Sequence, residues 1–137
     1  MTRGVGVDVV DLEGFRRQMA DPASRFVEGT FTARERQDAT TRASGDPGRH
    51  LAARFAAKEA FVKAWGGARF GLPPALRTVD LRTIEVVGDA WGRPTLRLSS
   101  DLAATVEESL GGPWRAHLSL SHDGPTALAY VVLEDLR

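Results

Sequence analysis

The stretch that decides the fold is HLAARFAAKEAFVKAWG, residues 50–66. It has no glycine or proline before Gly66, and alanine, leucine, lysine and glutamate favour helix, so it predicts a helix that ends there. At about 100° per residue, bulky side chains fall on one side and small ones on the other. The bulky set is Leu51, Phe55, Phe61, Val62 and Trp65, and the small set is Ala53, Ala57, Ala60 and Ala64. A helix that is apolar on both sides can be packed over most of its circumference, so we expect it to be largely buried.

The same helix carries four charges in two i,i+4 pairs, Arg54 with Lys58 and Glu59 with Lys63. On an exposed surface the second pair would contribute only ~0.2–0.5 kcal/mol. Lys58 falls on the bulky side, where an unpaired ammonium would be costly. Three cations and one carboxylate suit a bound polyanion with a metal ion, and they equally suit a structural network of ion pairs. The spacing alone leaves both interpretations open.

Composition sets the outer limits. The 137 residues are 42% hydrophobic, which is enough for one globular domain, residues 1–137, with a real core. Lys plus Arg and Asp plus Glu are equal at 18 each, so nothing in the overall charge indicates a nucleic acid or a membrane surface as partner. There is no cysteine, which excludes disulfides and thiolate metal ligands and fits a cytoplasmic protein. No segment approaches the ~20 apolar residues of a membrane span.

Near the start, GVGVDVV at residues 4–10 alternates valine with glycine and predicts a strand. Asp8 is its unusual member, because aspartate is depleted in strands. It is either a turn or cap residue, or a carboxylate held on a sheet with Gly6 leaving room beside it for a ligand. The apolar run continues through Val9 and Val10, and this favours the second interpretation.

The remaining elements follow from caps, periodicity and turn residues. Asp11 predicts a helix over residues 12–20, and the capping box of Thr32 and Glu35 predicts another up to about residue 42. Residues 43–49 predict a flexible loop. Two strand pairs are expected, at 83–87 with 95–98 and at 116–121 with 127–133, around a helix over 102–110 that Ser100 or Asp101 caps. Strands outnumber crossover helices, so the fold class is α+β with an antiparallel sheet.

Two further groups of side chains invite a functional interpretation. Arg16 and Arg17 point away from the apolar stripe of the first helix, and Arg25 follows after a break at Asp21-Pro22. These arginines form either a solvated face or a surface for an acidic partner. His117 and His122 lie in AHLSLSH, which has neither a nucleophile elbow nor zinc-ligand spacing. They are either hydrogen-bonded residues of a sheet end or phosphate donors.

Taken together, four fragments resemble a known family. VGVD at residues 5–8, RFAAKEAFVK at 54–63, GRP at 92–94 and HLSLSH at 117–122 closely resemble the holo-acyl-carrier-protein synthases, the short group of 4′-phosphopantetheinyl transferases. The resemblance runs in order over about residues 4–134. It implies Mg²⁺-dependent transfer of the phosphopantetheine arm of coenzyme A to a serine of an apo acyl carrier protein, with release of adenosine 3′,5′-bisphosphate. It also implies a homotrimer with active sites between subunits, and a fold in which an antiparallel sheet packs against a long central helix.

The resemblance also implies roles for particular residues. Asp8 and Glu59 match the magnesium-site carboxylates, and with Lys63, the pyrophosphate-binding lysine, they are the expected catalytic set. The residues expected to bind coenzyme A are Arg54, Lys58, Lys63, Gly92, Arg93, Pro94, His117, Ser119 and His122. Those expected to contact the carrier protein are Arg16, Arg17 and Arg25.

The chain departs from the family pattern at Asp123, where Ser or Thr is common, and in long loops at residues 43–49 and 67–79. Both departures flank the expected cleft, so they leave the preferred carrier, of fatty-acid or polyketide synthesis, open. Competing interpretations are a trimeric module that binds coenzyme A without transfer, and a different magnesium-dependent nucleotide enzyme. The joint presence of Asp8, Glu59 and Lys63 argues against the first.

Overall fold

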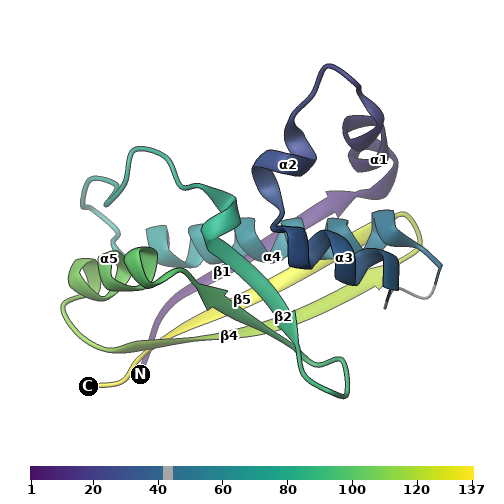
Figure 1. Cartoon of the computed structure of the whole chain (residues 1–137). Helices are drawn as coiled ribbons and strands as arrows, with labels where there is room; N and C mark the ends of the chain where they lie inside the picture. Colours follow the sequence, from purple (N-terminus) through teal and green to yellow (C-terminus); the bar gives the residue numbers. More distant parts are fainter. Residues whose placement is uncertain (42–44) are drawn as a thin grey trace.

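The computed structural model describes residues 1–41 and 45–137. Figure 1 shows two antiparallel sheets and a long helix that crosses the middle of the molecule. In chain order the elements are β1 Thr2–Asp11, α1 Leu12–Ala20, α2 Phe26–Thr30, α3 Ala33–Thr41, α4 Pro47–Ala68, a 3₁₀ turn Leu81–Thr83, β2 Ile84–Gly88, β3 Pro94–Leu98, α5 Ser100–Leu110, β4 Trp114–Asp123 and β5 Thr126–Asp135. The α+β class predicted from the sequence is confirmed.

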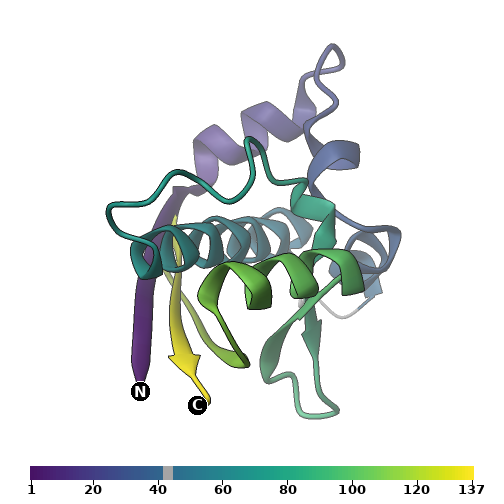
Figure 2. The same cartoon turned by 90° about the vertical axis from the view of Figure 1, so that its left-hand side faces the viewer.

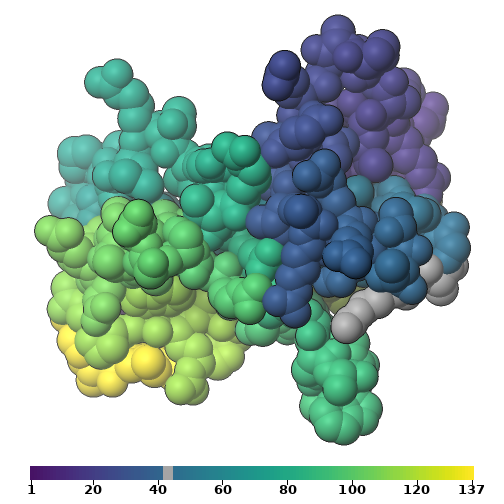
Figure 3. Space-filling model, viewed as in Figure 1, coloured from purple at the N-terminus to yellow at the C-terminus, as the bar shows by residue number. Residues whose placement is uncertain are grey.

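The larger sheet has the strand order β1-β5-β4, so the last strand lies between the first and the fourth. Asp8 pairs with Ala129 of β5, which pairs in turn with Leu120 of β4. A turn of two residues, Gly124 and Pro125, joins β4 to β5. The smaller sheet is the β2–β3 hairpin, whose turn projects from the body of the molecule (Figure 3). All five predicted strands are present, and β4 and β5 extend one or two residues beyond each predicted end.

Helix α4 lies against one face of the larger sheet, and both of its apolar sides are buried, as predicted (Figure 1). Two glycines of β1 allow the close approach. A Cβ at Gly4 would stand 2.1 Å from the carbonyl oxygen of Ala64, and one at Gly6 would stand 1.8 Å from that of Ala60. Any side chain at either glycine would therefore collide with the helix backbone. The expectation that Gly6 leaves room for a ligand is wrong, because α4 fills that space.

The bulky side of α4 packs on the rest of the core. Phe55 joins an aromatic cluster with Phe15 of α1 and Phe26 of α2, at ring centroid distances of 5.9 and 5.2 Å. At the other end of the helix, Trp65 donates from Nε1 to the Oγ of Ser109 in α5 at 2.9 Å. Figure 2 shows α5 beside the C-terminal half of α4. Helix α4 thus packs against the larger sheet on one side and against α1, α2 and α5 on the others.

The boundaries of α4 correct two predictions. The helix begins at Pro47, because Asp46 caps it by accepting from the backbone N–H of Arg49 at 3.1 Å and proline suits the first turn. The second half of the expected loop at residues 43–49 is therefore wrong, and residues 42–44 lie outside the described residues. The helix also continues past Gly66 to Ala68. Ala68 packs against the core, and this packing outweighs the ~1 kcal/mol that a helical glycine costs.

The predicted caps of α1 and α3 are confirmed. Asp11 accepts from the backbone N–H of Gly14 at 2.9 Å. In the capping box, Thr32 Oγ1 accepts from Glu35 N at 3.2 Å, and Glu35 Oε1 accepts from Thr32 N at 3.0 Å. Helix α5 is capped one residue earlier than predicted, by Ser99. No helix among residues 1–41 and 45–137 is long and apolar enough to cross a membrane.

Candidate active site

Strand β1 and helix α4 bring Asp8, Glu59 and Lys63 together. Lys63 Nζ donates to Asp8 Oδ1 and to the carbonyl oxygen of Val7, both at 3.0 Å. Glu59 lies one helical turn before Lys63 on the same side of α4. Asp8 is on the helix-facing side of β1, two residues after Gly6, so the contact that Gly6 permits places Asp8 beside this turn of the helix.

Two acids and one base make up the group, so its charges suit a bound divalent cation. Burial raises the pKa of Glu59 above the usual carboxyl range; the charge of Asp8 raises it further, and the ammonium of Lys63 opposes both. Two carboxylates that repel each other beside an exposed ammonium can accept a divalent cation together with a phosphate group.

The donor set fits magnesium. Magnesium prefers oxygen ligands, keeps several waters and is commonly held by one or two carboxylates plus substrate phosphate. In residues 1–41 and 45–137 no group of three or more histidine, cysteine or acidic side chains gathers as a ready-made metal site. Asp8 and Glu59 would therefore supply two ligands, and the substrate and water the others.

Lys58 does not belong to this site, which corrects the expectation that it binds coenzyme A. Its side chain is 0% exposed, and Nζ donates to Glu35 Oε1 at 2.7 Å and to the carbonyl oxygens of Thr30 and Leu81 at 2.7 and 2.8 Å. All three ammonium donors are satisfied inside the protein. For Lys58 the structural ion-pair interpretation is the correct one, because Glu35 reaches it from α3.

Sequence reasoning found Glu35 only as a capping residue. The structure adds its second oxygen, Oε2, which accepts from the backbone N–H of Val86 in β2 at 3.0 Å. One buried carboxylate thus joins α3, α4 and β2. No spacing in the sequence pointed to this contact, because Glu35 and Val86 are 51 residues apart.

The residues of HLSLSH do not join Asp8 within one chain. Asp8 is on β1 at one edge of the larger sheet, β4 forms the other edge, and β5 lies between them. His117 and Ser119 are exposed on β4, and His122 is exposed near the turn to β5. His117 Nε2 lies 2.8 Å from Glu134 Oε2 on the neighbouring strand.

A groove of about 500 Å³ between β3 and β4 brings His117 together with Pro94 of the GRP fragment. Arg115 and Trp114 also line it. Gly92 and Arg93 lie in the adjoining turn, where Gly92 has φ +82° and Arg93 Nε donates to Asp89 Oδ2 at 2.6 Å. Sequence reasoning missed Arg115, although it shares the face of His117 and Ser119 by strand alternation. Arg54 is half-buried on α4, directly before Phe55 of the aromatic cluster.

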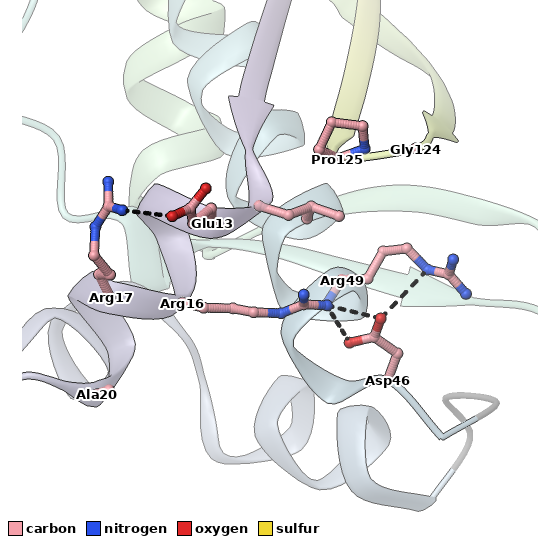
Figure 4. A pocket seen from close by; sticks show the side chains of 9 residues that line it. Glu13, Arg16, Arg17, Ala20, Asp46, Arg49, Gly124 and Pro125 are labelled. Atoms are coloured by element: carbon pink, nitrogen blue, oxygen red, sulfur yellow. Dashed lines mark hydrogen bonds and ion pairs between the residues drawn. The ribbon is translucent and has the colours of Figure 1, made fainter.

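The three arginines expected to meet a carrier protein are all exposed, and two are in ion pairs. Arg16 and Arg17 line a pocket of about 520 Å³ between α1, the start of α4 and the β4–β5 turn (Figure 4). Arg17 Nη1 pairs with Glu13 of its own helix at 3.0 Å, and Arg16 pairs with Asp46 across to α4. Arg25 immediately precedes α2.

Two carboxylates and an ammonium, carried by β1 and the buried helix α4 of an α+β fold, can hold a divalent cation beside a phosphate group, as enzymes that act on phosphorylated substrates do. The chain belongs to the 4′-phosphopantetheinyl transferase superfamily, whose family model matches residues 4–131, and within it to the holo-[acyl-carrier-protein] synthases.

The relatives support this assignment over nearly the whole chain. A holo-[acyl-carrier-protein] synthase of Mycobacterium sp. (strain KMS) is 48% identical over 132 residues, 96% of each chain. One of Corynebacterium glutamicum is 46% identical and covers 94% of this chain and 96% of its own. Among solved structures, an ACPS–CoA complex of Chronobacterium ammoniagenes matches with a TM-score of 0.89 and 44% identity over 98% of both chains.

Proposed function

We propose that Asp8, Glu59 and Lys63 are the reacting centre of a holo-[acyl-carrier-protein] synthase. The reaction moves 4′-phosphopantetheine from coenzyme A to a serine of an apo acyl carrier protein and releases adenosine 3′,5′-bisphosphate. The observation that carries the assignment is the contact of Lys63 with Asp8 one helical turn from Glu59, which gathers residues distant in the sequence at one point.

Glu59 is the group that takes the serine proton. A positioned general base of this kind typically contributes ~10²–10⁴ in rate. The serine oxygen then bonds to the phosphorus that carries pantetheine, the bond from that phosphorus to the bridging oxygen breaks, and the nucleotide leaves with that oxygen. Lys63 stabilises the negative charge on the leaving oxygen.

Asp8 and Glu59 would hold Mg²⁺ together with pyrophosphate oxygens. The bound ion supplies charge neutralisation on the pyrophosphate and alignment for in-line displacement. Lys63, which pairs with Asp8, keeps that carboxylate oriented toward the helix. The cytoplasm is the proposed compartment, as expected for a chain without cysteine.

The nucleotide of coenzyme A would occupy the groove of Pro94, Arg115 and His117, with Arg54 and the turn at Gly92 and Arg93 as further contacts. Because β5 separates this groove from Asp8 within one chain, we propose that a neighbouring subunit supplies it in a homotrimer. The outer face of the larger sheet supports this assembly. It exposes Val5, Val7, Val9 and Tyr130 by 49%, 46%, 59% and 45%, a row of apolar side chains that a partner subunit would cover.

The function is tested by intact-mass spectrometry of several apo acyl carrier proteins after incubation with this protein, coenzyme A and Mg²⁺. A gain of one phosphopantetheine that a chelator abolishes is the expected result. No gain on any carrier, with coenzyme A still bound, would support the binding module instead. The ranking of carriers would show which class, fatty-acid or polyketide, is preferred.

The residue roles have their own test. We expect Glu59→Gln and Lys63→Ala to lose at least ~100-fold in kcat while their thermal unfolding stays cooperative, because both side chains act on the reacting atoms. Glu108→Gln, an exposed exchange on α5 outside the site, the groove and the exposed valine face, is the control that should keep wild-type turnover. Unchanged turnover in either active-site variant would refute its assigned role.

A further inference from the structure

Arg16 differs from Arg17, its neighbour on α1, because it joins two elements. Its Nη2 lies 2.8 Å from both carboxylate oxygens of Asp46 (Figure 4). Asp46 is also the N-cap of α4, where it accepts from the backbone N–H of Arg49 at 3.1 Å. Helix α1 is therefore tied to the first turn of the helix that carries Glu59 and Lys63.

Gly48 provides a second, independent observation. Glycine in a helix costs ~1 kcal/mol relative to alanine, so its place in the first turn of α4 needs a reason. A Cβ at Gly48 would stand 3.0 Å from Arg16 Nε and 3.4 Å from Arg16 Cγ. Because Gly48 has no side chain, the Arg16 side chain can pass over the first turn of α4 and reach Asp46.

Arg17 makes the comparison clear. Its partner, Glu13, is on the same helix, and the side chains of Arg17 and Glu13 are 70% and 80% exposed, against 50% and 33% for Arg16 and Asp46. An exposed ion pair within one helix connects no second element. Its arginine can readily leave its own glutamate for an acidic side chain of a partner protein. The Arg16 pair spans from one element to another over a glycine.

We infer that Arg16 and Asp46 form a tether that positions α1 for the carrier protein, rather than Arg16 being a direct carrier contact. The inference rests on the proposed function and on the expectation from the family resemblance that the carrier docks near α1, from where its serine must reach Glu59. Asp46 and Glu59 are 13 residues apart on one helix, on the order of 20 Å at 1.5 Å per residue. A small rotation of α1 about its tether would displace a docked serine from the reacting phosphorus.

The tether is tested with Arg16→Gln, Asp46→Ser and the double variant. Serine keeps a capping oxygen for α4 and removes the carboxylate. We expect each single variant to raise the KM for the apo carrier several-fold, with the KM for coenzyme A unchanged, and the double variant to be no worse than either single one. If Arg16 instead contacts the carrier, Asp46→Ser releases it and lowers the carrier KM, which would overturn the inference.

Hydrogen–deuterium exchange tests the tether without any turnover. Arg16→Gln and Asp46→Ser should each speed exchange of the α1 amides, and Arg17→Gln, as the matched control, should leave them near the wild-type rate. Unchanged α1 exchange in the first two variants would refute the tether. A wild-type protein that transfers no phosphopantetheine would refute the proposed function instead, so the two failures are distinct.

Discussion

At the scale of single residues, three charged side chains of α4 have different surroundings although they lie within six residues of one another. Lys58 is enclosed and fully paired, Glu59 is half-buried with a raised pKa, and Lys63 is exposed beside Asp8. Residue type therefore does not distinguish a structural lysine from a functional one. What distinguishes them is whether solvent, and with it a substrate, can reach the ammonium.

Glu59 gives a pH-dependent prediction. Its folded-state pKa is raised above 4.5, so the folded protein holds this proton more tightly than the unfolded chain. The contribution of protonated Glu59 to the free energy of unfolding is fully present below the pKa of the unfolded chain, and it is lost as the pH rises through the pKa of the folded protein. In metal-free buffer, Glu59→Gln should unfold at a higher temperature than wild type at pH 8, and the difference should shrink as the pH is lowered. A difference independent of pH would show that Glu59 is not strained as a carboxylate.

His50 acts in the opposite sense. Burial, aided by the charge of Arg54, lowers its pKa from 6.5 to about 4, and its Nε2 has no hydrogen-bond partner in the described part of the chain. Stability from the neutral imidazole is present above pH 6.5 and is lost as the pH falls toward 4. We expect the melting temperature of His50→Gln to fall less steeply than that of wild type over this range, as differential scanning fluorimetry would record. A parallel decline of the two proteins would contradict the shifted pKa.

At the scale of elements, the Glu35–Lys58 pair fastens parts that are not adjacent in sequence. Lys58 binds the end of α2 and the 3₁₀ turn through the carbonyl oxygens of Thr30 and Leu81, and Glu35 binds β2. Helix α4 packs on the sheet through apolar contacts on one side. On the opposite side the polar hub, which is Glu35 and Lys58 with their backbone partners, bonds it to α2, α3, β2 and the 3₁₀ turn. Glu59 is the next residue after Lys58, so its position is fixed both by the apolar packing of α4 and by the polar contacts of Lys58.

Breaking the hub should destabilise the protein strongly. Lys58→Met leaves the Glu35 carboxylate buried without its cation, which typically costs ~3–5 kcal/mol. Urea unfolding followed by circular dichroism would measure the loss. Lys63→Met is the control on the same helix, and its exposed pair should contribute no more than ~1 kcal/mol. Equal stability of the two variants would contradict the structural role of Lys58.

At the scale of the whole molecule, the carboxylates and the groove proposed for coenzyme A lie apart within one chain. The carboxylates are on β1 and α4, and the groove with His117 is beyond β5 along β4. The exposed valines of β1 and Tyr130 of β5 lie on the outer face of the same sheet. Assembly of copies through this face is the arrangement that would bring one chain's carboxylates to another chain's groove.

Subunit mixing tests that arrangement. Asp8→Asn and an Arg115→Glu/His117→Ala double variant should each be inactive as pure proteins. Co-expressed with two different tags and purified through both, mixed trimers should recover about one third of wild-type activity, since each contains one interface with both halves intact. Mixed oligomers no more active than either parent would show that the site lies within one chain.

The amino-acid sequence alone determined the helix of residues 50–66, five strands, the caps at Asp11 and Thr32, and the fragments that mark the family. These are local properties, set by periodicity, capping chemistry and short motifs. Only the tertiary structure decided that Gly6 admits a helix and not a ligand, that Lys58 is structural, and that His117 is remote from Asp8 within one chain. The reason is physical: the charge and exposure of a side chain depend on which distant elements pack around it, and spacing along the chain does not specify those neighbours.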